Sequence, residues 1–384
     1  MRVLLMSPVA GHDVPGGDVA YTEALLARPP TGVTYTSYVD ALAEGSLVER
    51  GRRPRHGSIS GTDVVVLGAR AVELGLRASG LMFRESYRYL TVDPDAFDLM
   101  HAHIFAIRLI ASDLPLVTSS GFPLSVLYED RFYWTHRRVI VAAAADRVMS
   151  RVVGAEIPWL PPRRASRTMV QSAHYRNRLI EGGAGPDRVA VRTLGIEGRG
   201  STPRNRRPTT VGFVTTTFEQ KGGSTVLEAF RRLLAERPDA RLVIVGSERG
   251  PSPDGLPAES VTWMGMVPRR RLLEEILPAV DVMVLPTHCD SGPPFAILEA
   301  LQRGIPVVTS DLVWIDEELA GPGVRRVPVD PTLVAAALID LLDEDTYRRA
   351  SAAAVALWEA RYTMDAVAEQ VGATYREALA AGPS

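Results

Sequence analysis

Short apolar runs alternate with polar or amphipathic stretches along the whole chain of 384 residues. Most runs end at glycine, proline or a small polar residue, which is typical of strands buried on both faces of a parallel sheet. In the first half we predict strands at Val3–Val9, Val33–Val39, Asp63–Leu67, Leu99–Ile104, Leu114–Ser119, Arg147–Val152, Thr168–Gln171 and Val189–Ile196. A second series follows at Thr210–Thr215, Ala240–Gly246, Val261–Gly265, Asp281–Pro286, Pro306–Ser310 and Val324–Val329. This alternation predicts an α/β protein with two doubly wound sheets.

Two domains are expected, because the chain is too long for one ordinary core. The stretch 198–208 is polar and broken by glycine and proline, so we predict that it links residues 1–197 to residues 209–362. The pattern is helical from Pro331 onward. Residues 363–384 are expected to form a last helix that packs back on the first domain.

The composition is that of a globular protein, with 46% apolar and 23% charged residues. A formal net charge of -2 gives no reason to expect nucleic acid as a partner, and at most weak peripheral contact with a membrane. Cys289 is the single cysteine, so no intramolecular disulfide forms and a cytoplasmic location is expected. No apolar run approaches the length of a membrane span, and the run at Met1–Met6 is too short for a signal peptide.

Lys221 is the only lysine among 43 lysine and arginine residues. It follows the strand predicted at Thr210–Thr215 and precedes Gly222 and Gly223, which open the amphipathic segment Ser224–Glu236. A compact ammonium group beside free amides at a helix start is suited to binding phosphate. The alternative is a solvated residue in an arginine-rich composition. The basic clusters Arg52–Arg55 and Arg269–Arg271 are assigned no function.

Two further loops contain candidate ligand groups. After Val9, Gly16 and Gly17 precede a predicted helix, where the backbone can approach a ligand closely. The dinucleotide fingerprint is absent, so a plain turn is equally consistent.

The other loop lies between Pro286 and Pro306, where Glu299 falls in an otherwise apolar helix. A carboxylate in that position needs a partner, such as the diol of a ribose, or else faces water near the helix end.

These loops, in this order and spacing, resemble those of the family 4 glycosyltransferases. The matching segments are Gly16-Gly17, Asp98–His103, Leu194–Glu197, Arg241–Gly246, Val261–Gly265, Asp281–Pro286 and Glu299–Val308. The resemblance implies a GT-B fold, in which two Rossmann-like domains face a cleft. It also implies a UDP- or GDP-sugar donor held mainly by the second domain, transfer with retention at the anomeric carbon, and neither metal nor cofactor. The acceptor would be a small molecule, a glycan or a lipid-linked hydroxyl compound bound by the first domain.

The resemblance assigns roles to particular residues. Lys221 would neutralise the donor diphosphate, Glu299 would hold the ribose hydroxyls, and Ser291 would lie near the sugar. Gly16 and Gly17 would line the phosphate and acceptor side. The remaining donor-binding positions would be Thr216, Gly246, Met264, Gly292, Phe295 and Ala296. The acceptor-binding positions would be His103, Ser120 and Gly121.

The chain departs from the family pattern at positions that would recognise the sugar. Thr216 replaces an arginine, and Ser291 replaces the first acid of a Glu-x7-Glu motif, with Asp290 as its candidate substitute. Pro293 and Pro294 lack the amides that the family offers there. In addition, Ser120-Gly121 stands in place of an acceptor-side histidine.

Other functions remain alternatives at this point. A metal-dependent transferase would need an Asp-x-Asp motif after a strand, whereas Asp93-Pro94-Asp95 is a turn and Asp343-Glu344-Asp345 ends a helix. His101-x-His103 lacks the further ligands of a zinc site. Epimerisation or phosphorolysis would need acid and base groups that Ser120 and Ser291 do not supply. A degenerate GT-B protein that binds a nucleotide or sugar and supports a partner enzyme is the non-enzymatic alternative. The aromatic residues Tyr128, Phe132, Tyr133 and Trp134 are consistent with an acceptor cleft or with core packing.

Overall fold

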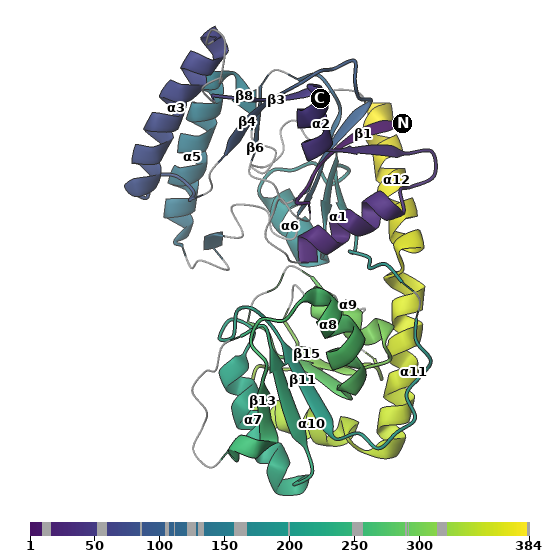
Figure 1. The fold of residues 1–384 in the computed structure, drawn as a ribbon. Helices are drawn as coiled ribbons and strands as arrows, with labels where there is room; N and C mark the ends of the chain where they lie inside the picture. Colours follow the sequence, from purple (N-terminus) through teal and green to yellow (C-terminus); the bar gives the residue numbers. More distant parts are fainter. Residues whose placement is uncertain are drawn as a thin grey trace. The chain divides into compact units, whose positions relative to one another are not determined.

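The computed structural model describes residues 1–9, 17–51, 60–84, 87–103, 107–110, 112–120, 128–129, 134–156, 167–198, 200–247, 256–288, 290, 292–312 and 321–381. Its contacts divide the chain into two units (Figure 1). Unit 1 comprises Met1–Arg192 and Ala368–Ser384, and unit 2 comprises Thr193–Val367.

Unit 2 is a doubly wound domain built on one parallel sheet. Its strands run in the order β13-β12-β11-β14-β15-β16, which is 3-2-1-4-5-6 in chain order. The strands are β11 Thr210–Val214, β12 Arg241–Val245, β13 Val261–Trp263, β14 Val282–Leu285, β15 Val307–Ser310 and β16 Val324–Val327. The helices are α7 Gly223–Glu236, α8 Arg269–Arg271 with the short helical turns Leu272–Ile276 and Leu277–Ala279, α9 Phe295–Gln302, α10 Pro331–Leu341 and α11 Glu344–Arg361, and a 3-10 turn at Ala258–Ser260 precedes β13. Each predicted strand of this half coincides with an observed one, because these runs are short and apolar, and the central strands are buried on both faces of the sheet.

The segment predicted as a linker packs along unit 2. The guanidinium of Arg204 donates hydrogen bonds to the carbonyls of Leu277 and Arg303 at 3.1 and 3.0 Å. The last helix, α12 Met364–Ala381, belongs to unit 1 from Ala368 onward. Its Tyr375 hydroxyl lies 2.9 Å from the hydroxyl of Tyr35.

Unit 1 contains a second parallel sheet, of order β10-β9-β7-β5-β1-β2. Its strands are β1 Arg2–Met6, β2 Thr34–Ser37, β5 Leu99–His103, β7 Leu116–Ser120, β9 Arg167–Val170 and β10 Val189–Val191, with helices α1 Gly17–Ala27, α2 Tyr38–Glu44 and α6 Ala173–Glu181. Within the described residues, no helix has the combination of length and apolar character that crossing a bilayer requires.

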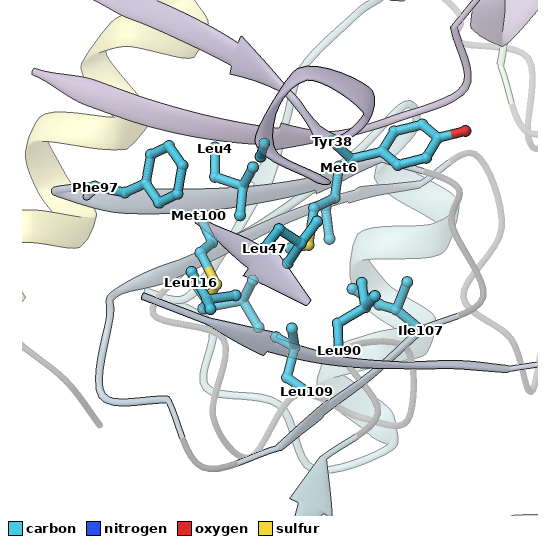
Figure 2. Packing of buried hydrophobic residues seen from close by; sticks show 13 residues of the cluster. Leu4, Met6, Tyr38, Leu47, Leu90, Phe97, Met100, Ile107, Leu109 and Leu116 are labelled. Atoms are coloured by element: carbon cyan, nitrogen blue, oxygen red, sulfur yellow. The ribbon is translucent and has the colours of Figure 1, made fainter. Parts of the chain in front are cut away.

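A smaller mixed sheet, which the sequence analysis missed, covers the main sheet of unit 1. It has the order β3-β4-β6-β8, with β3 Leu47–Arg50, β4 Arg88–Val92, β6 Ile107–Ile110 and β8 Ala155–Glu156. Figure 2 shows apolar side chains of both sheets packed together, including Leu4 and Met100 from the main sheet and Leu90 and Leu109 from the small one. Complete burial of each such side chain contributes about 2 kcal/mol.

Two long helices cover the other face of the small sheet: α3 Gly61–Ala78 and α5 His136–Val153 (Figure 1). The strands predicted at Asp63–Leu67 and Arg147–Val152 are therefore wrong, since both runs lie inside these helices. The run of valines in α3 reads as a buried strand, but a side-chain cap from Ser60 starts a helix there, and packing overrides the weak β preference of valine.

A buried ionic cluster joins the helix pair to the small sheet. Because side chains alternate along β6, Arg108 points to the helices while Ile107 and Leu109 face the main sheet. The fully buried Arg108 guanidinium lies 2.8 Å from Glu73 of α3 and 2.7 Å from Asp146 of α5. One cation thus faces two carboxylates, and the hydroxyl of Tyr89 donates to Glu73 at 2.6 Å.

Stability is expected to fall between about pH 5 and pH 7 because of Asp146. Burial, together with the nearby charge of Glu73, raises the pKa of Asp146 to about 7, and Arg108 only partly opposes this. A carboxyl whose pKa is raised in the folded state stabilises that state at low pH and loses this contribution as the pH rises through the folded pKa. Urea unfolding across this range should show a loss of on the order of 2 kcal/mol. The slope should largely vanish in Asp146→Asn and persist in the exposed control Asp345→Asn; equal slopes in all three proteins would contradict the assignment.

Candidate functional site

The candidate site lies where the strand order of unit 2 reverses. Strands β11 and β14 are neighbours in the sheet, but the chain continues from β11 toward one edge and from β14 toward the other. Open α/β sheets bind ligands outside the carboxyl ends of the strands at such a switch point. The loop after β11 contains Lys221, and the loop after β14 contains Asp290 and Gly292. Sequence positions far apart therefore meet at one edge of the sheet.

Close backbone packing fixes the Lys221 loop against the end of β14. Gly222 has a positive φ of 79°, and a Cβ there would lie 2.3 Å from the carbonyl oxygen of Pro286. The amide of His288 donates to the carbonyl of Gln220 at 3.0 Å. Only glycine fits at position 222, because both its conformation and its surroundings exclude a side chain.

Lys221 forms an ion pair with Asp290 across the two loops. The side chains are 18% and 13% exposed, so the pair is largely but not completely shielded from water. Asp290 thus directs the ammonium group to the switch point, and it balances the charge of Lys221. An incoming anion would compete with this carboxylate for the lysine.

Two helices begin beside this pair without a side-chain cap. The residue before α7 is Gly222, and the residue before α9 is Pro294; neither offers a side-chain acceptor to the first amides of its helix. Phe295 and Ala296 are the first two residues of α9. Uncapped helix starts carry partial positive charge and free amide donors. Together with Lys221 they make a site suited to a diphosphate.

Glu299 is a buried carboxylate on α9, as expected for an acid that needs a partner. Its Oε1 lies 2.5 Å from a guanidinium nitrogen of Arg269 at the start of α8. Burial raises the pKa of Glu299, and the charges of Arg269 and Arg303 oppose the rise. Arg269 belongs to a basic cluster to which the sequence assigned no function. The sequence signal that could have identified Arg269 was Glu299, an acid in an apolar helix that needs a partner, and not the basic cluster itself.

The carboxyl ends of β11, β12 and β13 are held together by backbone contacts. The amide of Gly246 donates to the carbonyl of Gly265 at 2.8 Å, and that of Met264 donates to Ile244 at 2.9 Å. Gly246 has a φ of 85°, and a Cβ there would lie 2.6 Å from the Thr215 carbonyl. The predicted donor positions Thr216, Gly246 and Met264 therefore lie at adjoining strand ends, on the same edge as Lys221.

The predicted acceptor residues lie in unit 1. Ser120 ends β7, whereas Gly121 falls outside the described residues. Of the other predicted site residues, Gly17 opens α1, whereas Gly16 and Ser291 fall outside the described residues. His103 ends β5 and is buried.

The ring of His103 lies in a buried polar chain. Its Nδ1 is 2.7 Å from the Ser119 hydroxyl, and its Nε2 is 3.5 Å from a carboxylate oxygen of Asp18. His101 reaches the same hydroxyl at 2.7 Å, and burial, aided by the charge of His103, lowers the pKa of His101 well below its usual value. Asp18, 40% exposed, is the member of this chain nearest to solvent, and no sequence motif marked it.

Tyr128 and Trp134 pack in a buried aromatic cluster with Phe83, so these two belong to the core; Phe132 and Tyr133 lie outside the described residues.

Comparison with solved structures shows what this topology is. The chain superposes on Anabaena HepE in complex with UDP-glucose with a TM-score of 0.60 and 14% identity, covering 98% of this chain and 99% of that one. Sucrose-phosphate synthase from Thermosynechococcus elongatus gives a TM-score of 0.61 at 16% identity, with coverage of 99% and 100%. The chain has the GT-B fold. Its two units are the two Rossmann-like domains of that fold.

Sequence comparisons identify a family model and known proteins to which this GT-B chain is similar. Residues 208–344 match the family model described as Glycosyl transferases group 1. The chain is 31% identical over 186 residues to D-inositol 3-phosphate glycosyltransferase of Segniliparus rotundus, a match that spans 45% of this chain and 40% of that protein. It is 26% identical to phosphatidyl-myo-inositol mannosyltransferase of Mycolicibacterium smegmatis over 350 residues, 83% of each chain.

Proposed function

We propose that the protein is a glycosyltransferase that moves a sugar from a nucleoside-diphosphate-sugar to a hydroxyl acceptor, with retention at the anomeric carbon and without a metal ion. The observation that carries the proposal is the switch point of unit 2. There the chain's single lysine and two uncapped helix starts lie on one edge of the sheet. The match of residues 208–344 to a glycosyltransferase family model covers this same region.

The arrangement fits the charge that develops when a donor is cleaved. As the bond between the sugar and the diphosphate breaks, negative charge accumulates on the leaving phosphate. Lys221 and the amides of Phe295 and Ala296 would stabilise that charge more strongly than the charge of the intact donor. The leaving phosphate oxygen would accept the acceptor proton, so this reaction needs no separate base. HepE, a GT-B neighbour, has been crystallised with UDP-glucose, which supports a UDP-sugar donor here.

Glu299 would hold the ribose hydroxyls of the donor. Its carboxylate now faces Arg269, which is 46% exposed, so the ion pair lies at the boundary between the core and water. The hydroxyls of a ribose would donate hydrogen bonds to the carboxylate and lie next to Arg269. The buried contacts of α9 would stay as they are. Asp290 would release Lys221 when the diphosphate arrives and remain close to the sugar, where the family resemblance places an acid.

Turnover of a donor panel tests the proposal. We would incubate the full chain with UDP-, GDP-, ADP- and dTDP-sugars in the presence of EDTA and measure release of the nucleoside diphosphate. With water as the acceptor, proton NMR of the anomeric hydrogen of the freshly released sugar would report the stereochemistry. Turnover of one donor with retention is expected. Binding of a nucleotide without any turnover would favour a degenerate binder, and neither binding nor turnover would overturn the proposed site.

A further inference from the structure

The outer face of the α3 and α5 pair is apolar, although it faces solvent. Eight of the thirteen large apolar residues that are exposed among the described residues lie on these two helices, each between 47% and 66% exposed. They are Val64, Val65, Val72 and Leu74 of α3, and Ile140, Val141, Val148 and Val152 of α5. Scattered single residues of this kind are ordinary, but a cluster over two adjacent helices marks a surface that is covered in use. We call this the α3/α5 face.

Helix α3 presents apolar residues to solvent and places its charged residues on the inner side, the reverse of an ordinary surface helix. None of its exposed residues is charged, and Asp63, Arg70, Glu73 and Arg77 lie on its inner side or flanks. A surface helix usually places its apolar stripe on the core and its charges in water. The apolar outer face of α3 is therefore a feature of the sequence and not a consequence of one exposed side chain.

The buried ionic cluster fixes this orientation. Arg108 of the small sheet contacts Glu73 of α3 and Asp146 of α5, and all three side chains are buried. Rotating either helix to bury its valines would expose or unpair these charges, which is costly. The inward ion pairs thus hold the exposed apolar residues of both helices toward solvent.

The charge on the α3/α5 face has one sign. Helix α5 exposes Arg137, Arg138, Arg147 and Arg151 and no acidic residue. Among the described residues, the ion pairs include none made by Arg137, Arg147 or Arg151. The face therefore combines an apolar surface with unpaired positive charge.

We propose that the α3/α5 face binds the surface of a membrane that contains anionic lipids. Helices that lie in the membrane interface present an apolar side to the acyl chains and arginine to the phosphates. The apolar residues extend along both helices rather than lining a pocket, which suits a planar partner. A second copy of the chain is a poorer partner, because a two-fold contact would set the arginines against a face without acids. The inference is independent of the proposed glycosyl transfer.

Vesicle flotation with the full chain tests the inference. We expect the protein to float with vesicles of equal parts phosphatidylcholine and phosphatidylglycerol, at least about tenfold more strongly than with pure phosphatidylcholine, and to be released by high salt. Two variants should each lower this binding about tenfold: Val64→Ser/Val72→Ser/Leu74→Ser, which removes apolar contacts, and Arg147→Glu/Arg151→Glu, which reverses charge. Thermal unfolding should stay near that of the wild type, because the changed side chains are exposed.

Matched controls lie in unit 2. Leu333→Ser on α10 and Arg348→Glu/Arg349→Glu on α11 change exposed residues of the same kinds and should leave vesicle binding unchanged. Equal binding to both vesicle types, or binding that neither α3/α5 variant affects, would overturn the inference. A wild-type dimer in light scattering that Val72→Arg dissociates, together with no vesicle binding, would assign the face to a second copy instead.

Discussion

Replacing Lys221 with alanine is expected to lower kcat/KM for the sugar donor by more than about tenfold. The variant removes the one ammonium group at the switch point while the Asp290 carboxylate stays, so the charge balance there shifts against a diphosphate. The loss should appear mainly in kcat if the lysine acts on the charge that forms as the donor breaks. Initial rates of nucleoside diphosphate release over a range of donor concentrations measure both constants.

A matched control separates this effect from general loss of positive charge. Arg270 is highly exposed and, among the described residues, forms an ion pair with Glu274 one helical turn away, so Arg270→Ala should retain activity close to that of the wild type. The double variant Lys221→Ala/Asp290→Asn removes the negative charge of Asp290 as well, and it should recover part of the lost donor affinity but not the lost kcat. Unchanged turnover in Lys221→Ala would remove this residue from the site.

Replacing Arg108 with methionine is expected to destabilise the protein by about 3 to 5 kcal/mol, the cost of removing one partner from a buried ion pair. Glu73 and Asp146 would then lose the cation that contacts both of them in the interior. Because Arg108 joins β6 to both α3 and α5, the loss should affect unit 1 first. Urea unfolding with hydrogen exchange of the small sheet would measure the size and the place of the change.

A compensated variant shows whether unpaired charge is the cause. Arg108→Met/Glu73→Gln/Asp146→Leu removes all three charges and should regain most of the lost stability, since apolar replacement of a whole buried ion cluster is often close to neutral. If the triple variant is as unstable as Arg108→Met, the loss comes from packing of the long arginine side chain against Tyr87 and Tyr89 instead.

The sequence predicts unit 2 well because burial there follows a simple pattern. Its strands lie between helices on both faces, so each one is a short apolar run that ends at a turn residue. In unit 1 the same reasoning fails at Asp63–Leu67 and at Arg147–Val152, where several apolar residues lie on the solvent side of helices. If every apolar run is interpreted as a buried strand, a helix with an apolar outer surface is predicted wrongly. The small sheet was missed because Arg88–Val92 does not alternate strictly and its pairing partners lie far away in sequence.

The candidate site was predicted in part, for a related reason. Lys221 and Glu299 were identified because each is an unusual residue for its place in the chain. Their partners, Asp290 and Arg269, depend on which strand ends adjoin in the sheet. Sequence spacing gives the order of loops, whereas strand order decides which loops meet. Asp18 could not be found for the same reason, since its approach to His103 joins α1 to β5.

The central claim is that a nucleoside diphosphate binds at the switch point of unit 2, with Lys221 on its phosphates. Calorimetric titration of the wild type and Lys221→Ala with UDP and with uridine tests this most directly, with GDP and guanosine as the second pair. We expect the wild type to bind one diphosphate at least about tenfold more tightly than its nucleoside, and Lys221→Ala to lose most of that difference while binding the nucleoside equally well. Equal loss of diphosphate and nucleoside binding, or no preference for the diphosphate in the wild type, would contradict the claim.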